Sequence, residues 1–367
     1  MAFDERVVPR ALDVAVVGGG PAGCATAIAL ARRGLAVALL ERSCYDTPRV
    51  GETLPPESRV PLAALNSLQR VDDDTHLRSS GIVSVWGENL PYQNDFVFNP
   101  YGHGWHLDRR RFDAMLARSA ADAGVHVLVA STVRRCEAHS DGFDIDADRA
   151  REGACRLRSR FVVDATGRGC SPLPGVAHRI VYDKLVGLVG FVIPPRGQSD
   201  TRTLLEAVCD GWWYTALLPG NRRVVAYMTD GDQLKLHRRD LFRFFVARVG
   251  EAPHTRAKVG MPSDVESLHV LAASTYRHAS IHGERWLKVG DAACAYDPLS
   301  SSGVLKALQS GLDAAAAIDA WLAGDVAAPA RYAARIQQRF TAYLGTRAIY
   351  YGREMRWPAS PFWQRRH

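Results

Sequence analysis

A glycine-rich turn near the start of the chain constrains its fold more than any other feature. Gly18, Gly20 and Gly23 have the spacing G-x-G-x-x-G, and they join an apolar strand, 12–17, to an alanine-rich helix, 21–33. In such a turn the first glycine permits a tight bend, the second lets the backbone approach a pyrophosphate, and the third lets the helix pack closely on the strand. The helix N-terminus then offers free N–H groups to the phosphates. The turn therefore predicts a dinucleotide-binding βαβ unit.

An acidic residue follows at the spacing that such a unit requires. A second buried strand, 35–40, ends at Glu41, which lies 18 residues after Gly23. An acidic residue about 20 positions after the glycine turn binds ribose hydroxyls in dinucleotide-binding proteins. We therefore expect Glu41, with Arg42 beside it, to contact the cofactor.

Later segments predict that the sheet begun here is interrupted and then completed. Short strand patterns at 204–208, 212–218 and 224–229, with a hairpin signal at 219–221, indicate an antiparallel sheet in the middle of the chain. Nearer the N-terminus, the Pro- and Gly-rich segment 48–61 is expected to be loop, 62–71 is expected to be helical, and Asp108 is a good N-cap for a helix that runs to about Ala123. A further strand at 286–289 leads to a long helix at about 302–322. The nucleotide-binding half is therefore expected to be discontinuous.

Three further motifs resemble a known family. Asp164-Ala165-Thr166-Gly167 and Gly290-Asp291-Ala292-Ala293 each follow an apolar strand, and 297–303 precedes the long helix. Together with the Arg-x-x-Phe-Asp pattern at 109–113, they resemble the glutathione-reductase-type FAD proteins of the p-hydroxybenzoate hydroxylase superfamily. The resemblance implies non-covalent FAD, with Asp291 at its ribityl chain and Arg109 nearby. It also implies cofactor contacts from Pro298, Ser302 and Gly303.

The fold class that follows is α/β. We expect a Rossmann-like FAD-binding domain of the glutathione-reductase type, with an antiparallel β-sheet substrate domain. The FAD-binding domain is expected to comprise 10–75, 107–180 and 275–330, the substrate domain 76–106 and 181–274, and a C-terminal helical and aromatic tail 331–367.

A narrower resemblance concerns two segments. One is 51–56, with the sequence Gly-Glu-Thr-Leu-Pro-Pro, and the other is 211–219. Both are similar to a subgroup related to tryptophan halogenases that includes the maturation flavoproteins of lysine and glycine oxidases. The resemblance implies an FAD-dependent monooxygenase that hydroxylates an electron-rich ring through a flavin C4a-hydroperoxide. The implied substrate is an indole or phenol, or a tryptophan side chain of a precursor protein during quinone cofactor maturation.

Two residues are catalytic candidates, and both have plainer interpretations. Glu52 lies in the loop that the resemblance places beside the flavin, where it either acts as a general base or caps a turn. Trp213 lies on a predicted strand, where core packing is the default and a wall of the substrate site is the alternative. His103 and His106 lie in the expected substrate region, where a histidine is more often structural.

Other activities remain open. Tryptophan halogenases carry a lysine some 25 to 30 residues beyond the Gly-Glu loop, whereas this chain has no lysine before Lys184, which disfavours halogenation. A flavin-dependent oxidase or reductase of a small molecule, or a flavin-bearing assembly factor that mainly binds a partner, is also compatible with the motifs. No second G-x-G-x-x-G occurs, so NAD(P)H would dock transiently or a separate reductase would deliver the electrons, with O2 as the oxidant.

Composition excludes several other classes. The net charge is +7, but the arginines are spread along the chain and form no stripe, which argues against nucleic-acid binding. No apolar run reaches about 18 residues, so no membrane span is expected. The first apolar stretch is too short for a secretory signal, which favours a cytoplasmic location. The seven cysteines include no C-x-x-C pair, so neither disulfides nor a metal site is expected.

Overall fold

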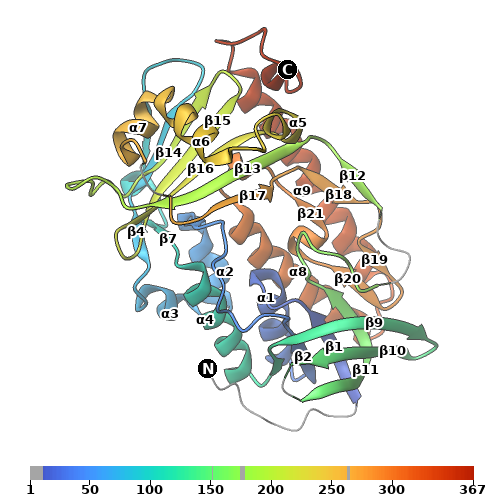
Figure 1. Cartoon of the computed structure of the whole chain (residues 1–367). Coiled ribbons are helices and arrows are strands. Elements are labelled where there is room, and N and C mark those ends of the chain that lie inside the picture. Colours follow the sequence, from blue (N-terminus) through green and yellow to red (C-terminus); the bar gives the residue numbers. More distant parts are fainter. Residues whose placement is uncertain (1–10, 151, 174–177, 263–264) are drawn as a thin grey trace.

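Two sheets organise the chain. The computed structural model describes residues 11–150, 152–173, 178–262 and 265–367. An eight-stranded sheet lies at the bottom of the view in Figure 1 and a seven-stranded sheet at the top, with long helices between them. This is the mixed α/β architecture that the sequence predicts, with a parallel Rossmann-like sheet and a separate antiparallel sheet.

The eight-stranded sheet contains the glycine turn. Its core order is β19-β20-β11-β1-β2-β8, and β1 pairs in parallel with both β2 and β11. The strands β9 and β10 extend it as an antiparallel hairpin onto β11. Its strands are β1 (Ala11–Val17), β2 (Val37–Leu40), β8 (His126–Leu128), β9 (Ser131–His139), β10 (Gly142–Arg149), β11 (Gly153–Asp164), β19 (His282–Gly283) and β20 (Trp286–Lys288).

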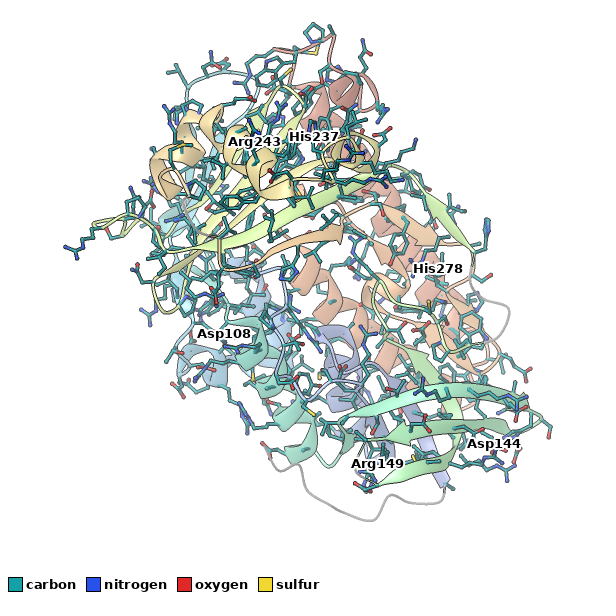
Figure 2. The ribbon with its side chains drawn as sticks, in the orientation of Figure 1. Asp108, Asp144, Arg149, His237, Arg243 and His278 are labelled. Carbon is teal, nitrogen blue, oxygen red and sulfur yellow. The ribbon has the colours of Figure 1, made fainter. Side chains whose placement is uncertain are left out.

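Helices α1 (Pro21–Ala31), α4 (Arg109–Asp122) and α8 (Gly303–Leu322) pack together in the core beside this sheet. The contact between α1 and α8 is very close, because a Cβ at Gly311 would lie 2.6 Å from the carbonyl oxygen of Ala22. The helix α4 begins where the sequence predicts, just after Asp108 (Figure 2). The Asp108 carboxylate accepts hydrogen bonds from the backbone N–H groups of Arg110 and Arg111. This packing brings the N-termini of α1 and α8 to the same region.

The seven-stranded sheet has the order β17-β13-β16-β15-β14-β5-β6 and is antiparallel except for the β14–β5 pair. Helices α5 (Gly231–Lys235), α6 (Leu241–Gly250) and α7 (Pro253–Val259) lie over its outer face (Figure 1). The strands are β5 (Gly81–Val85), β6 (Tyr92–Asp95), β13 (Leu185–Val192), β14 (Thr203–Val208), β15 (Gly211–Leu218), β16 (Arg222–Asp230) and β17 (Leu268–Ala272).

Two small sheets connect these parts. One has the order β3-β7-β4 and the other the order β12-β18-β21. Their strands are β3 (Thr53–Leu54), β4 (Leu77–Ser79), β7 (Gly104–His106), β12 (Arg179–Val181), β18 (Tyr276–His278) and β21 (Cys294–Ala295). No helix among the described residues is both long and apolar enough to cross a membrane.

The structure corrects two local expectations. A single helix was expected over 62–71, but there are two short helices, α2 (Arg59–Ala64) and α3 (Leu68–Asp72). The break falls at Asn66, whose φ of +48° is incompatible with a continuous helix. The segment 48–61, expected to be all loop, contains β3 and the start of α2.

The C-terminal segment is an integral part of the core. After the 25-residue helix α9 (Ala328–Gly352), the chain returns to the inner face of the seven-stranded sheet, where α10 (Pro361–Gln364) docks. Trp363 is fully buried there and donates a hydrogen bond from Nε1 to the carbonyl oxygen of Val208 at 3.0 Å. Arg366 is also buried and pairs with Asp230 at 2.6 Å. The tail therefore completes this core.

We predict that Trp363→Ala destabilises the protein by about 3–5 kcal/mol, because it leaves a large cavity and an unpaired carbonyl group. Denaturant unfolding of the purified protein measures this change. Val326→Ala is the matched control, since Val326 is 80% exposed in the turn between α8 and α9. Equal stability of the two variants would show that the tail is only peripherally attached.

Candidate active site

The glycine turn has the geometry that close approach of a phosphate requires. Gly18 has a φ of +112°, which favours glycine, and a Cβ at Gly23 would lie 1.9 Å from the Gly18 carbonyl oxygen. A Cβ at Gly20 would meet no atom within 4 Å, so the space in front of this residue is open. Gly20 is also the N-cap of α1, and no side chain caps the helix. The free N–H groups of α1 therefore face open space, as an anion site needs.

Glu41 lies where the sequence predicts, at the end of β2 beside this turn. Its Oε2 accepts a hydrogen bond from the N–H of Gly19 at 2.7 Å, and its Oε1 accepts from the Ser43 hydroxyl at 2.6 Å. The guanidinium of Arg49 contacts the same carboxylate at 3.0 Å and continues to Asp113 at 2.8 Å. Glu41 is thus fixed against the glycine turn, whereas Arg42 is exposed.

Arg109 holds the next loop in place. From the first turn of α4, its Nη1 donates hydrogen bonds to the carbonyl oxygens of Val50 and Gly51, at 2.8 and 3.0 Å. Its Nε donates to the carboxylate of Asp113, which is fully buried. In this structure Arg109 is therefore a positioning residue for the loop that precedes Glu52.

Asp291 lies between two cations close to the start of α1. Lys306 contacts its carboxylate at 2.7 Å and Arg168 at 3.3 Å. Burial acts to raise the pKa of Asp291, but the two cations outweigh burial and hold the pKa below its usual range. A Cβ at the preceding Gly290 would lie 2.8 Å from that of Ala22, so this turn packs directly on the first turn of α1. The carboxylate is therefore ionised and fixed beside the glycine turn.

The N-terminus of α8 is the second helix N-terminus in this candidate site, after that of α1. Pro298 begins a short 3-10 turn, and Ser302 then precedes Gly303, the first residue of α8. No side chain caps α8, so its first N–H groups are available. Ser301 has a φ of +48°, and its buried hydroxyl group has no hydrogen-bond partner in the part of the chain that the structure describes. An uncapped helix end and an unsatisfied hydroxyl suit the polar edge of a cofactor ring.

These features fit FAD. The two uncapped helix N-termini, the open space at Gly20 and the carboxylates of Glu41 and Asp291 could hold an extended dinucleotide from its adenosine end to its ring. The expected cofactor residues are thus brought together, except that Arg42 is only a neighbour of the site.

Glu52 is buried beside this region. Only 2% of its surface is exposed, and its Oε1 has no hydrogen-bond partner among the described residues. Burial raises the pKa of Glu52 to about 7, against the opposing effect of backbone N–H groups and of Arg109. The adjacent strand β3 contacts α8. This carboxyl group therefore has the properties of a group that exchanges a proton near neutral pH.

A buried chain of hydroxyl groups runs from the residue after Glu52. The Thr53 hydroxyl lies 2.8 Å from that of Tyr214 and 3.4 Å from that of Thr203. Thr203 in turn lies 2.9 Å from Nε2 of His106, whose Nδ1 lies 2.8 Å from the Leu217 carbonyl oxygen. Burial lowers the pKa of His106 to about 4, so its ring is neutral and fully engaged. His106 therefore positions the hydroxyl chain.

Trp213 does not lie at this site. Its ring is fully buried on the outer face of the seven-stranded sheet, 4.9 Å from the ring of Tyr227 and 5.2 Å from that of Phe245. Because side chains alternate along β15, Tyr214 points to the opposite face, toward Thr53. The packing interpretation of Trp213 holds, and the catalytic one is not retained.

Comparisons with known proteins support dependence on FAD. A family described as FAD dependent oxidoreductase matches residues 13–183. A putative FAD-dependent oxidoreductase, LodB of Marinomonas mediterranea, is 28% identical over 97% of this chain and 96% of its own length. The chain is therefore similar to FAD-dependent oxidoreductases along nearly its whole length.

Two solved structures of flavin-dependent or tryptophan-modifying enzymes are similar to this chain over nearly its whole length. The myxobacterial chondrochloren halogenase CndH has a TM-score of 0.88 and 25% identity, over 98% of this chain and 86% of that chain. The peptidyl tryptophan dihydroxylase QhpG has a TM-score of 0.79 and 26% identity, over 97% of this chain and 78% of that chain. The resemblance inferred from the motifs is thus supported for the family, whereas the subgroup stays a prediction.

Several residues of the site escape sequence reasoning. Arg49 connects Glu41 to Asp113, which lies 64 residues further along the chain, and Lys306 pairs with Asp291; no motif pointed to Arg49 or Lys306. Arg168 carried a usable signal, because it directly follows the Asp-Ala-Thr-Gly motif at 164–167.

We predict that Gly20→Ala leaves the apoprotein folded but weakens FAD binding at least about tenfold, or about 1.4 kcal/mol. The added methyl group meets no protein atom but occupies the space in which the pyrophosphate would lie. Flavin fluorescence titration of the apoprotein measures the affinity, and circular dichroism checks the fold. Gly250→Ala, an equally open position near the end of α6, is the control. Unchanged affinity in Gly20→Ala would place the pyrophosphate elsewhere.

Proposed function

We propose that this protein is a monooxygenase that hydroxylates an electron-rich aromatic ring, and that the ring is a tryptophan side chain of a peptide or protein. The observation that carries the proposal is the buried carboxyl group of Glu52, with an unpartnered oxygen and a pKa raised by burial to about 7. The relative QhpG, a peptidyl tryptophan dihydroxylase, supports the choice of substrate.

An apolar wall lies beside this carboxyl group. Val50, Tyr214 and Leu299 all border the core on the inner face of the seven-stranded sheet. They come from the loop before Glu52, from β15 and from the turn before α8, and all three pack against the same buried cluster. Such a wall excludes water and suits a planar aromatic ring.

The reaction requires two electrons and two protons, since ArH, O2, two electrons and two protons give ArOH and water. Bound FAD, when reduced, supplies the electrons and activates O2. The electrons would come from NAD(P)H or a separate reductase. The Oε1 atom of Glu52 accepts a hydrogen bond from the indole N–H or phenol O–H, which enriches the ring in electrons. Glu52 then takes up the proton that the ring loses as aromaticity returns.

Halogenation is the second candidate, because CndH and other halogenases are among the relatives. The lysines of this chain argue against it. Lys258, Lys288 and Lys306 are engaged by Asp200, Asp164 and Asp291 respectively. The segment 76–82, at the spacing of the halogenase lysine, contains only His76 and Arg78 as basic residues. A guanidinium group stays protonated and cannot replace an amine as a nucleophile.

Incubation with ¹⁸O2, a reducing system and N-acetyltryptophanamide or a tryptophan-containing peptide tests the proposal. We expect the product to gain one or two labelled oxygen atoms by mass spectrometry, with no halogen incorporated when chloride or bromide is present. A product that loses two hydrogens without label would indicate an oxidase, and a halogenated product would identify a halogenase. Either result would overturn the proposed hydroxylation.

We predict that Glu52→Gln lowers kcat/KM about 10²- to 10⁴-fold at neutral pH while FAD remains bound. In the unmodified protein kcat/KM should rise as the pH passes upward through about 7, because the raised pKa keeps Glu52 protonated below that value and only the carboxylate accepts a proton. The pH profile of labelled product measures both effects. If Glu52→Gln keeps the same rate and the same rising limb, Glu52 is not the base.

A further inference from the structure

The strand β6 lies at the edge of the seven-stranded sheet. It pairs with β5, and no other strand of the described chain covers its second edge. Proteins usually protect such edges with charges, prolines or covering segments, because unpaired backbone groups attract other chains. Beside the strand, four apolar side chains are largely exposed: Leu90 (76%), Tyr92 (72%), Val97 (80%) and Phe98 (88%). The segment 90–98 contains no basic residue and one acidic residue, Asp95, so an anionic membrane is a poor partner for it.

A cavity of about 830 Å³ opens where β6 ends. One wall comes from the residues that follow the strand, including Phe96, Val97 and His103, and the other from the loop 199–202. The polar groups in the walls are mutually engaged, since Arg202 and Lys258 neutralise Asp200, and Arg59 lies 3.0 Å from His103. Its volume lies in the range of pockets that enclose a small organic group.

This cavity adjoins the candidate active site. Thr203 directly follows the loop 199–202 and is hydrogen-bonded to His106, which belongs to the strand after His103. Thr203 also lies 3.4 Å from Thr53, the neighbour of Glu52. The strands β7 and β3 approach so closely that a Cβ at Gly104 would lie 2.6 Å from the Leu54 carbonyl oxygen. The cavity and the candidate site therefore share β7 and the start of β14 as a common wall.

We propose that β6 and this cavity form the docking surface for an extended segment of the polypeptide substrate. The backbone of that segment adds to the free edge of β6, and one of its apolar side chains enters the cavity beside Val97 and Phe98. An edge strand provides alternating N–H and C=O groups that only an extended backbone can match along its length, which is why the occupant is a polypeptide. The inference rests on the proposed function, because it supplies the binding site for a tryptophan carried by a protein.

The test measures binding without turnover, so that it does not depend on hydroxylation. The full-length, FAD-loaded protein, without reductant, is titrated with a fluorescent peptide of alternating threonine and valine around one tryptophan. A second peptide of the same sequence carries N-methyl groups on alternate amides and cannot pair along one edge. We expect the first peptide to bind at least about fivefold more tightly, a difference of about 1 kcal/mol. Amide exchange at 92–95 should slow on binding.

Two double variants test whether the peptide binds at the proposed docking surface. We expect the double change Val97→Ser and Phe98→Ser to weaken binding of the first peptide at least about fivefold without changing the unfolding midpoint, because both side chains are exposed. Leu236→Ser with Val326→Ser, two exposed residues on other surfaces, is the matched control and should leave binding unchanged.

Three results would overturn the docking surface. These are no binding of the unmodified peptide, equal binding of the N-methylated peptide, and a concentration-dependent dimer abolished by the Val97 and Phe98 changes, which would make a second copy of the chain the occupant. Peptide binding with no labelled oxygen in any product would instead refute the hydroxylation and leave the docking surface standing.

Discussion

One buried carboxylate, that of Asp113, connects the glycine turn to the loop that carries Glu52. It is fully buried on α4 and contacts both Arg49, at 2.8 Å, and Arg109, at 3.2 Å. Arg49 extends to Glu41 beside the glycine turn, and Arg109 extends to the backbone before Glu52. Removing one partner of such a buried pair leaves an uncompensated charge, which costs more than the pair itself contributes. The positions of the dinucleotide turn and of the Glu52 loop are therefore interdependent.

A second connection runs through α9. Asp297, in the turn before α8, accepts a hydrogen bond from the Tyr351 hydroxyl at 2.8 Å, and that hydroxyl accepts one from Nε1 of Trp212 at 3.1 Å. One turn earlier on α9, Arg347 bridges Asp297 and Asp183, which stands just before β13. A single face of α9 thus ties the turn before α8 to the seven-stranded sheet. The seven-stranded sheet and this turn are therefore held together by ion pairs whose aspartates are both largely buried.

Local chemistry explains which parts of this arrangement could be predicted. The glycine turn, the cap at Asp108 and the strands of the hairpin around Gly220 depend on neighbouring residues, so their sequences suffice. The break at Asn66 depends on a left-handed backbone conformation, which asparagine tolerates but which the presence of an asparagine does not by itself predict. Whether Trp213 lies in the core or at the site depends on which face of the sheet α6 covers. The pairing of Lys306 with Asp291 depends on how α8 packs on α1. Such tertiary contacts cannot be predicted from the local sequence pattern.

The raised pKa of Glu52 follows from the same constraints that hold it in place. Its own carbonyl oxygen accepts a hydrogen bond from the N–H of Leu107, and its Oε2 accepts one from the N–H of Gly51. The carboxyl group therefore cannot turn toward solvent to recover hydration. A rise from the ordinary value of 4.5 to about 7 corresponds to about 3 kcal/mol of folding free energy that is lost as the pH rises through this interval, because the folded state retains a proton that the unfolded state has released. A fold that needed only a turn cap here could use glutamine without this cost. In the proposed reaction this carboxyl group, buried and held in place by these hydrogen bonds, is the one that takes up the proton that the ring loses.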